Sequence, residues 1–298
     1  MQAIRNLFRG PWTSAERLEG KTVLITGANT GIGKETAVDL AGRGAKIIMA
    51  CRDMDKAQAA TKEVIERSGN DNVVCMKLDL ADSKSIKEFA QAINQGESKL
   101  NILINNAGVM VCPYGKTADG FEMQIGINHM GHVLLTYLLL DLIKRSAPAR
   151  IVTVSSMAHS WGTIKLDDIN SEKHYDKQKA YSQSKLANVL FTRSLAKRLQ
   201  GTGVTAYSLH PGMVQTDLWR HLNGPQRFLM KLVSPFTKSS EKGAKTTIYC
   251  AVDPALENES GGYYSDCAPA NCSAEGKDDA LAQKLWELSC QMLNITWE

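Results

Sequence analysis

Short apolar segments alternate with longer segments of helical periodicity along most of the 298-residue chain. This alternation is typical of a parallel β-sheet with helices on both faces, because parallel strands are joined by long crossovers that usually contain a helix. The expected strands are 22–26, 46–50, 73–78, 102–105, 151–155, 204–209 and a short one at 263–265. The sequence therefore predicts a single-domain α/β fold, with one doubly wound parallel sheet of about seven strands.

Local signals mark where the intervening helices begin and end. Gly44 is expected to end the first helix, and Ser85 with Glu88 has the spacing of a capping box. Helices are expected to begin near Ile32, Asp53, Ser83, Phe121 and Tyr181, with two more at 241–252 and 278–293. We divide the chain into an N-terminal arm, residues 1–20, and one domain, residues 21–298.

A glycine-rich turn directly follows the first expected strand and leads into a helix. Glycine lets the backbone turn sharply and lets a pyrophosphate approach, while the positive end of the helix stabilises the anion. Glycines also gather at such turns for tight packing alone, but the strand-turn-helix context favours dinucleotide binding and a Rossmann-type fold. The expected cofactor contacts in this turn are Gly27, Asn29, Thr30, Gly31, Ile32 and Gly33.

The end of the second strand should decide between NAD and NADP. An acidic residue there would bind the ribose hydroxyls, whereas Arg52 can bind a 2′-phosphate through charge-assisted hydrogen bonds. The neighbouring Asp53 argues for NAD, unless it serves as the N-cap of the next helix. We therefore expect NADP(H), with Lys34 and Asn29 as auxiliary phosphate contacts.

Tyr181 and Lys185 are four residues apart in a segment of helix formers, so both should project from one helix face. A nearby ammonium, together with the positive nicotinamide ring of an oxidised cofactor, favours the phenolate, so we expect the pKa of Tyr181 to lie below the usual tyrosine value of about 10. Such a tyrosine can exchange a proton with an alcohol or carbonyl oxygen. The pair Ser155-Ser156 ends the fifth strand at the sheet edge where ligands bind. The alternative is a solvated helix face and two serines that begin a turn.

In combination, these motifs resemble those of the short-chain dehydrogenase/reductase family, in the family's order and over nearly the whole chain. They are TGANTGIG at 26–33, NNAG at 105–108, Asn128, Ser156, Tyr181 with Lys185, and His210-Pro211-Gly212. The resemblance implies that Ser156, rather than Ser155, orients the substrate, that Tyr181 is the acid/base, and that Lys185 assists Tyr181 and binds ribose. Asn128 would help to hold a proton-relay water. The further cofactor contacts that it implies are Asp79, Leu80, Asn105, Ala107, Gly108, Pro211, Gly212 and Thr216.

Longer segments, including ACRD at 50–53 and YSQSKLANVLFTRSLAKRLQGTGV at 181–204, resemble the retinol dehydrogenase branch, whose members reduce retinal with NADPH. The irregular segment 211–238 is rich in large apolar residues and is expected to form a substrate lid suited to a retinoid or lipid aldehyde. An ordinary amphipathic helix is the alternative for this segment. The competing functions are a broader lipid-aldehyde or steroid carbonyl reductase and a non-catalytic NADP-binding scaffold.

Composition excludes several other classes of function. The net charge of +4 is spread along the chain, so no nucleic-acid partner is expected. The seven cysteines include no CxxC pair, which argues against structural zinc and for a reducing compartment. His129 and His132 have helical spacing but no accompanying ligands, so we interpret them as core histidines and expect no metal.

No segment approaches the roughly 18 to 20 uninterrupted apolar residues that span a bilayer, and no secretory signal is recognisable. The first dozen residues have the pattern of a basic amphipathic helix for a membrane surface, with an arm packed on the protein as the alternative. We expect an intracellular protein, cytosolic or peripherally attached to a membrane such as the endoplasmic reticulum. The family resemblance also permits a homo-oligomer through the Tyr181 helix.

Overall fold

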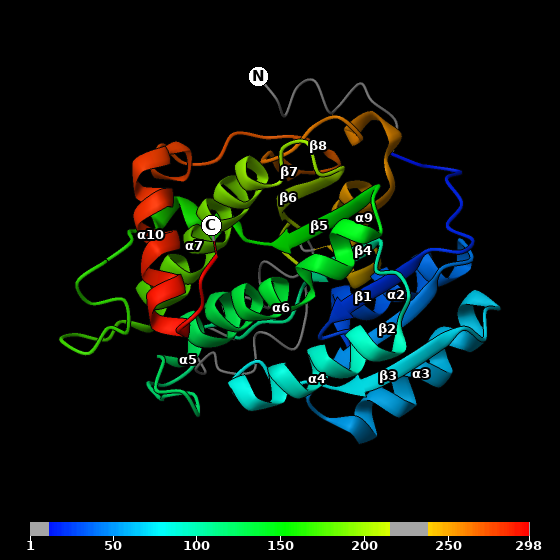
Figure 1. The fold of residues 1–298 in the computed structure, drawn as a ribbon, viewed down its shortest axis with the longest axis horizontal. Coiled ribbons are helices and arrows are strands. Elements are labelled where there is room, and N and C mark those ends of the chain that lie inside the picture. The colour runs from blue at the N-terminus through cyan, green and yellow to red at the C-terminus, as the bar shows by residue number, and fades with distance from the viewer. Residues whose placement is uncertain (1–11, 215–237, 298) are drawn as a thin grey trace.

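Eight strands form a single sheet in the part of the chain that the computed structural model describes, residues 12–214 and 238–297 (Figure 1). Their order is β3-β2-β1-β4-β5-β6-β7-β8, and each neighbouring pair is parallel except β7 with β8. The strands are β1 (Thr22–Thr26), β2 (Lys46–Cys51), β3 (Val73–Lys77), β4 (Ile102–Asn105), β5 (Ala149–Val154), β6 (Val204–His210), β7 (Tyr263–Ser265) and β8 (Ala268–Pro269). The predicted doubly wound sheet is confirmed, with β8 as an additional edge strand.

Helices occupy the crossovers and cover both faces of the sheet (Figure 1). The helical elements are α2 (Gly31–Gly42), α3 (Met54–Ser68), α4 (Ser83–Gly96), α5 (Met123–Ile125), the π-helical turn η1 (Gly126–Met130), α6 (Gly131–Arg145), η2 (Met157–Trp161), α7 (Lys177–Arg198), α9 (Ser240–Val252), η5 (Pro254–Leu256), η6 (Glu275–Lys277) and α10 (Asp279–Leu293). Helices α2, α3 and α9 pack on one face, and α4, α6 and α7 pack on the other.

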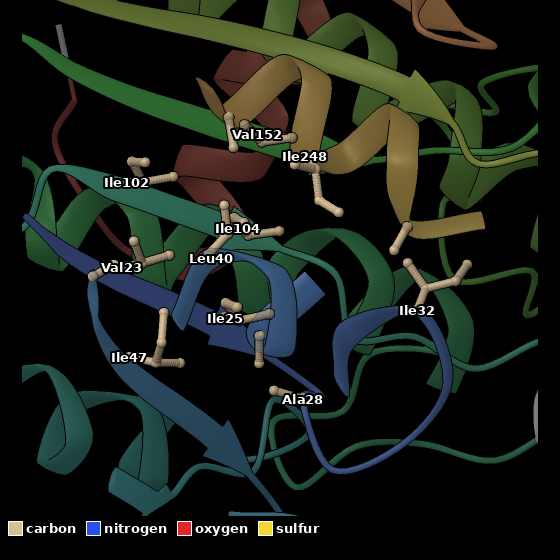
Figure 2. Packing of buried hydrophobic residues seen from close by; sticks show 14 of the residues in the cluster. Val23, Ile25, Ala28, Ile32, Leu40, Ile47, Ile102, Ile104, Val152 and Ile248 are labelled. Carbon is tan, nitrogen blue, oxygen red and sulfur yellow. The ribbon is translucent and has the colours of Figure 1, made fainter. Parts of the chain in front are cut away.

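The strand β1 shows why its sequence is apolar throughout. Val23 and Ile25 point into the core under α2 and α9; Figure 2 shows them near Leu40, with Ile248 beyond Ile104 in the same cluster. Leu24 points to the opposite face and packs in the cluster formed with α4, α6 and α7. All five residues of β1 are buried, because a parallel strand covered on both faces has no side that meets water.

Two of the predicted helix-end signals are confirmed by the structure, and two others differ from it. Gly44 follows α2 with a φ of +93°, and Asp53 caps α3 by accepting from the Lys56 N–H at 3.2 Å. The capping box predicted for Ser85 and Glu88 is wrong. Asp82 caps α4 instead, and the Ser85 hydroxyl accepts a hydrogen bond from the Asp79 N–H at 3.0 Å. Helix α7 begins at Lys177, four residues before the predicted start, because Asp176 bonds its first N–H groups.

The segment Met123–Arg145 is, within residues 12–214 and 238–297, the helical stretch that is long and apolar enough to cross a membrane. Its most apolar window is 83% buried inside the protein. It includes the core residues Leu135 and Leu139, which pack under the sheet. This stretch therefore serves as a core helix of the fold.

The described ends of the chain pack on the domain. The Trp12 indole N–H donates to Asp253 at 2.6 Å and its ring meets the edge of Tyr249. Helix α10 lies along the outer side of α7 (Figure 1), where the guanidinium of Arg198 is 4.1 Å from the Trp286 ring centroid. The remainder of the predicted arm, residues 1–11, and most of the predicted lid, residues 215–237, lie outside the described residues.

Candidate active site and cofactor cleft

A cavity of about 960 Å³ lies at the carboxyl ends of the parallel strands, where the strand order reverses between β1 and β4. Open α/β sheets bind ligands at such a switch point. The cavity brings together most of the predicted site residues: Gly27, Asn29, Thr30, Gly31, Ile32, Gly33, Arg52, Asp79, Leu80, Ala107, Gly108, Ser156, Tyr181, Lys185, Pro211 and Gly212. Asn105 and Asn128 lie behind its wall, and Thr216 lies outside the described residues.

The glycine turn is held close to the loop after β4. A Cβ on Gly33 would lie 2.5 Å from the Gly27 carbonyl oxygen and 2.6 Å from the Asn106 amide nitrogen. The Asn106 amide also donates to the Thr26 carbonyl at 2.8 Å, and the Thr26 hydroxyl accepts from the Asn106 and Ala107 N–H groups at 2.9 Å. Glycine is required at position 33 because the backbone there has no space for a side chain.

Asn106 is the asparagine of the NNAG motif that faces the cofactor cleft. It lines the cavity, whereas its neighbour Asn105 is 1% exposed and donates to the Thr136 hydroxyl at 3.1 Å. The expectation that Asn105 contacts a cofactor is therefore not supported by its position. The NNAG motif indicated the loop, but the pattern alone could not tell which asparagine faces the cavity.

At the far end of the cavity, charged residues surround the end of β2. Asp53 caps α3 and accepts from the Lys56 ammonium at 3.0 Å, and these contacts with Lys56 hold the pKa of Asp53 below its usual value. Arg52 lines the cavity and has no salt-bridge partner among the described residues. Lys34 was expected to contact phosphate. It is absent from the cavity lining, but its ammonium bonds both oxygens of the lining residue Glu63, at 2.6 and 2.8 Å.

Ser156, Tyr181 and Lys185 meet at the other end. The Ser156 hydroxyl hydrogen-bonds the Tyr181 side chain, and the Lys185 ammonium lies 5.8 Å from the centroid of the Tyr181 ring. The Lys185 ammonium also donates to the Val154 carbonyl at 3.1 Å. The Ser155 hydroxyl instead donates to the Lys185 carbonyl at 2.7 Å, so it is committed to the backbone of α7.

Burial controls the protonation of this pair. It raises the pKa of Tyr181 to about 12, although the hydrogen bond from Ser156 acts in the opposite direction. It lowers the pKa of Lys185 to about 8. The chain without cofactor therefore has a raised Tyr181 pKa, because desolvation of the phenolate is the largest effect, and the lowering expected beside an oxidised nicotinamide stays a prediction. At neutral pH, Tyr181 is a phenol that can donate a proton.

Asn128 supports the site from behind. It lies in the π-helical turn η1 and is fully buried. Its amide accepts from the Val109 N–H at 2.8 Å and donates to the Val109 carbonyl and the Ser184 hydroxyl, both at 2.9 Å. A Cβ on Gly108 would lie 3.0 Å from the Asn128 oxygen and 3.7 Å from the Lys185 nitrogen, so these three residues are immediate neighbours.

The histidines behave as core residues. His129 bonds the Ser289 hydroxyl at 3.0 Å, while His132 bonds the Thr26 hydroxyl at 2.9 Å. Burial lowers the pKa of His129 to about 4 and that of His132 to about 3. Among residues 12–214 and 238–297, no group of three or more His, Cys, Asp or Glu side chains has the arrangement of a metal site.

Large apolar side chains surround the mouth beside Ser156 and Tyr181. Met157, Trp161 and Met213 line the cavity and are 44%, 69% and 45% exposed. The sequence had placed Met213 in an apolar lid, but it had not singled out Met157 or Trp161. A signal for these two existed, because the short helix η2 starts immediately after Ser156 and must lie at the same sheet edge.

The chain is similar to known proteins over nearly its whole length. The family model described as short chain dehydrogenase matches residues 21–227. Retinol dehydrogenase 12 of Homo sapiens is 53% identical, with 99% of this chain and 94% of the relative covered. Retinol dehydrogenase 14 of Mus musculus is 49% identical, with 93% of this chain and 87% of the relative covered.

Solved structures agree on the fold. A crystal structure of an uncharacterised protein from Mycobacterium paratuberculosis superposes with a TM-score of 0.79 at 38% identity, covering 97% of this chain and 100% of that one. The Pseudomonas aeruginosa RhlG/NADP active-site complex superposes with a TM-score of 0.68 at 24% identity, covering 89% and 98%. The second similarity concerns the fold alone.

Proposed function

Because the chain belongs to the short-chain dehydrogenase family, we propose that it is an NADP(H)-dependent oxidoreductase that reduces an apolar aldehyde, retinal, to its alcohol. One observation carries this proposal. Ser156, Tyr181 and Lys185 meet at one end of a cavity whose other end holds the glycine turn and Arg52. Such a cavity has room for a dinucleotide and places a proton donor where a carbonyl would lie.

The residues at the glycine end fit a dinucleotide. Helix α2 begins at Gly31 and has no acidic residue in its first turn, so its positive end is open to a pyrophosphate. Gly27 and Gly33 keep the turn free of side chains where the backbone is most crowded. A bound NADPH would supply a hydride to the substrate carbonyl carbon.

The proposed preference for NADP over NAD rests on Arg52 and Asp53. The Asp53 carboxylate is occupied by the α3 cap and by Lys56, so it is poorly placed to bind ribose hydroxyls. Arg52 lines the cavity with its charge available to a 2′-phosphate. This arrangement supports NADP over NAD, the cofactor that the sequence also favoured.

The chain's own residues account for the proton transfer. The Ser156 hydroxyl holds the carbonyl oxygen, and Tyr181 donates its phenolic proton to that oxygen as the hydride reaches the carbon. The phenolate that remains is unfavourable in this buried position. The Lys185 ammonium stabilises it, which is the reason for a lysine one helical turn after the tyrosine.

The substrate class is inferred from the exposed apolar rim. Met157, Trp161 and Met213 provide a large apolar surface next to the proton donor, as a long hydrophobic aldehyde requires. The names of the relatives make retinal the first substrate to test. A broader reductase of lipid aldehydes or steroids would use the same catalytic groups.

The test is a substrate and cofactor panel with the purified protein. All-trans-retinal, a medium-chain aldehyde and a ketosteroid are each incubated with NADPH or NADH, and alcohol formation is measured by chromatography. We expect retinol from retinal, with NADPH preferred. A ketosteroid converted far faster than either aldehyde would contradict the substrate assignment, and NADPH binding without conversion of any carbonyl would contradict the enzymatic function.

A further inference from the structure

The segment Val109–Cys112 lies just beyond the end of β4, where two buried side chains and one half-buried tyrosine bond its backbone. The Asn128 amide bonds both the N–H and the carbonyl of Val109. The Tyr175 hydroxyl donates to the Cys112 carbonyl at 2.8 Å. Between them, the Val111 N–H donates to the Gln124 side-chain oxygen at 2.8 Å. The shape of this segment is therefore set by side chains from elsewhere in the chain.

Val111 has a φ of +54°, in the left-handed region. A β-branched residue is strongly disfavoured there, and such a conformation persists only where the surroundings impose it. Val111 and Met110 also line the cavity that contains Ser156 and Tyr181. The strained residue is thus part of the wall of the proposed active site.

Gln124 is the residue that connects this wall to the catalytic helix. It is 0% exposed, and its amide nitrogen donates to the Tyr175 hydroxyl and to the Lys177 carbonyl, both at 2.9 Å. Lys177 is the first residue of α7, which carries Tyr181. Both amide N–H groups of Gln124 are used, and its oxygen is left for Val111.

We propose that Gln124 is a positioning residue that holds Val111 in its left-handed conformation and fixes the Met110–Val111 wall relative to the start of α7. This inference rests on the proposed carbonyl reduction, since the wall matters as the surface that places the carbonyl against Tyr181. Gln124 is absent from the cavity lining, so it acts through Val111 and Lys177.

Gln124→Met tests this role, because methionine keeps the length and removes the hydrogen bonds. The matched control is Gln183→Met. Gln183 is 3% exposed and lies outside the cavity lining. It also bonds two backbone groups, the Lys165 N–H at 2.9 Å and the Ile169 carbonyl at 3.0 Å. The substrate is whichever panel carbonyl the wild type reduces fastest. We expect Gln124→Met to lower kcat/KM about tenfold, mainly in kcat, and Gln183→Met to change it by less than about twofold. The Kd of NADPH should stay within about twofold in both.

A second substitution separates positioning from general stability. Asparagine tolerates the left-handed region, so Val111→Asn should need less support from Gln124. In the Val111→Asn background, Gln124→Met should cost less than about threefold in kcat/KM. The proposal is overturned if that loss is as large as in the wild-type background, or if Gln183→Met reduces kcat/KM as much as Gln124→Met does.

Hydrogen exchange tests the positioning role of Gln124 without any substrate. We expect amides of residues 107–114 to exchange faster in Gln124→Met than in wild type, and to be unchanged in Gln183→Met. Equal exchange in wild type and Gln124→Met would overturn the proposal. A wild type that reduces no carbonyl would contradict the proposed function instead, and the exchange result would still decide the role of Gln124.

Discussion

At the scale of single residues, the protonation of Lys185 should set the upper pH limit of carbonyl reduction. Burial lowers the pKa of Lys185 to about 8 and raises that of Tyr181 to about 12. Above pH 8 the lysine loses the charge that stabilises the developing phenolate, while Tyr181 keeps its proton. We therefore expect kcat/KM to fall as pH rises through 8, in an assay from pH 6 to 10 with thermal stability measured at each point. A kcat/KM that stays constant up to pH 10 would contradict the role of the Lys185 charge.

A second residue-scale prediction concerns cofactor choice. Arg52→Glu should raise the Kd of NADPH by roughly 10- to 100-fold, since a hydrogen-bonded charge contributes about 1.5–3 kcal/mol, and should leave NADH binding within about threefold. Fluorescence titration measures both constants. Lys46→Met is the control, because Lys46 pairs with Glu97 and neither residue lines the cavity. Equal weakening by both substitutions would indicate a general electrostatic effect, contrary to a specific phosphate contact.

At the scale of elements, the glycines of α2 provide a matched pair. A Cβ on Gly33 would lie 2.5 Å from the Gly27 carbonyl oxygen, whereas one on Gly42 would meet no atom within 4 Å. Gly33→Ala should therefore lower the midpoint of thermal unfolding and weaken NADPH binding by at least about tenfold. Gly42→Ala should stabilise the protein by about 0.5–1 kcal/mol, because alanine favours the helix. Wild-type NADPH affinity in Gly33→Ala would contradict the conclusion that the glycine turn has no space for a side chain at position 33.

Elements were predictable where their signals are local. The strand β1, the glycine turn and the Asp53 cap depend on residues adjacent in sequence, and the structure contains all three. The prediction of a capping box at Ser85 was wrong because the Ser85 hydroxyl accepts a hydrogen bond from the Asp79 N–H, six residues away. A spacing rule does not show that an equally suitable cap, Asp82, stands just ahead.

At the scale of the whole molecule, α10 and α7 enclose one core region. Trp286 is 5% exposed and stacks on Phe191 with ring centroids 5.6 Å apart. Trp286→Ala should lower the free energy of unfolding by about 3–5 kcal/mol, measured by urea denaturation. Trp161→Ala, at a site that is 69% exposed, should change it by less than about 0.5 kcal/mol. A loss from Trp286→Ala as small as that expected for Trp161→Ala would mean that α10 contributes little to the core.

Tertiary contacts also explain what the sequence could not predict about the site. The motifs singled out Tyr181, Lys185 and Ser156, but they did not indicate that burial raises the pKa of Tyr181 in the chain without cofactor, because burial depth is absent from a local pattern. Gln124 was missed for a related reason. Its role depends on Val111 and Lys177, which are separated from it by 13 and 53 residues.

The most direct test of the central claim is the single-turnover rate of NADPH oxidation by retinal in wild type and Tyr181→Phe. Loss of the proton donor should lower this rate by about 100-fold or more, while the Kd of NADPH stays within about twofold. Tyr249→Phe, on α9 and outside the cavity lining, should react like wild type. A Tyr181→Phe protein that retains the wild-type rate would contradict the assignment of Tyr181 as the acid in this reduction.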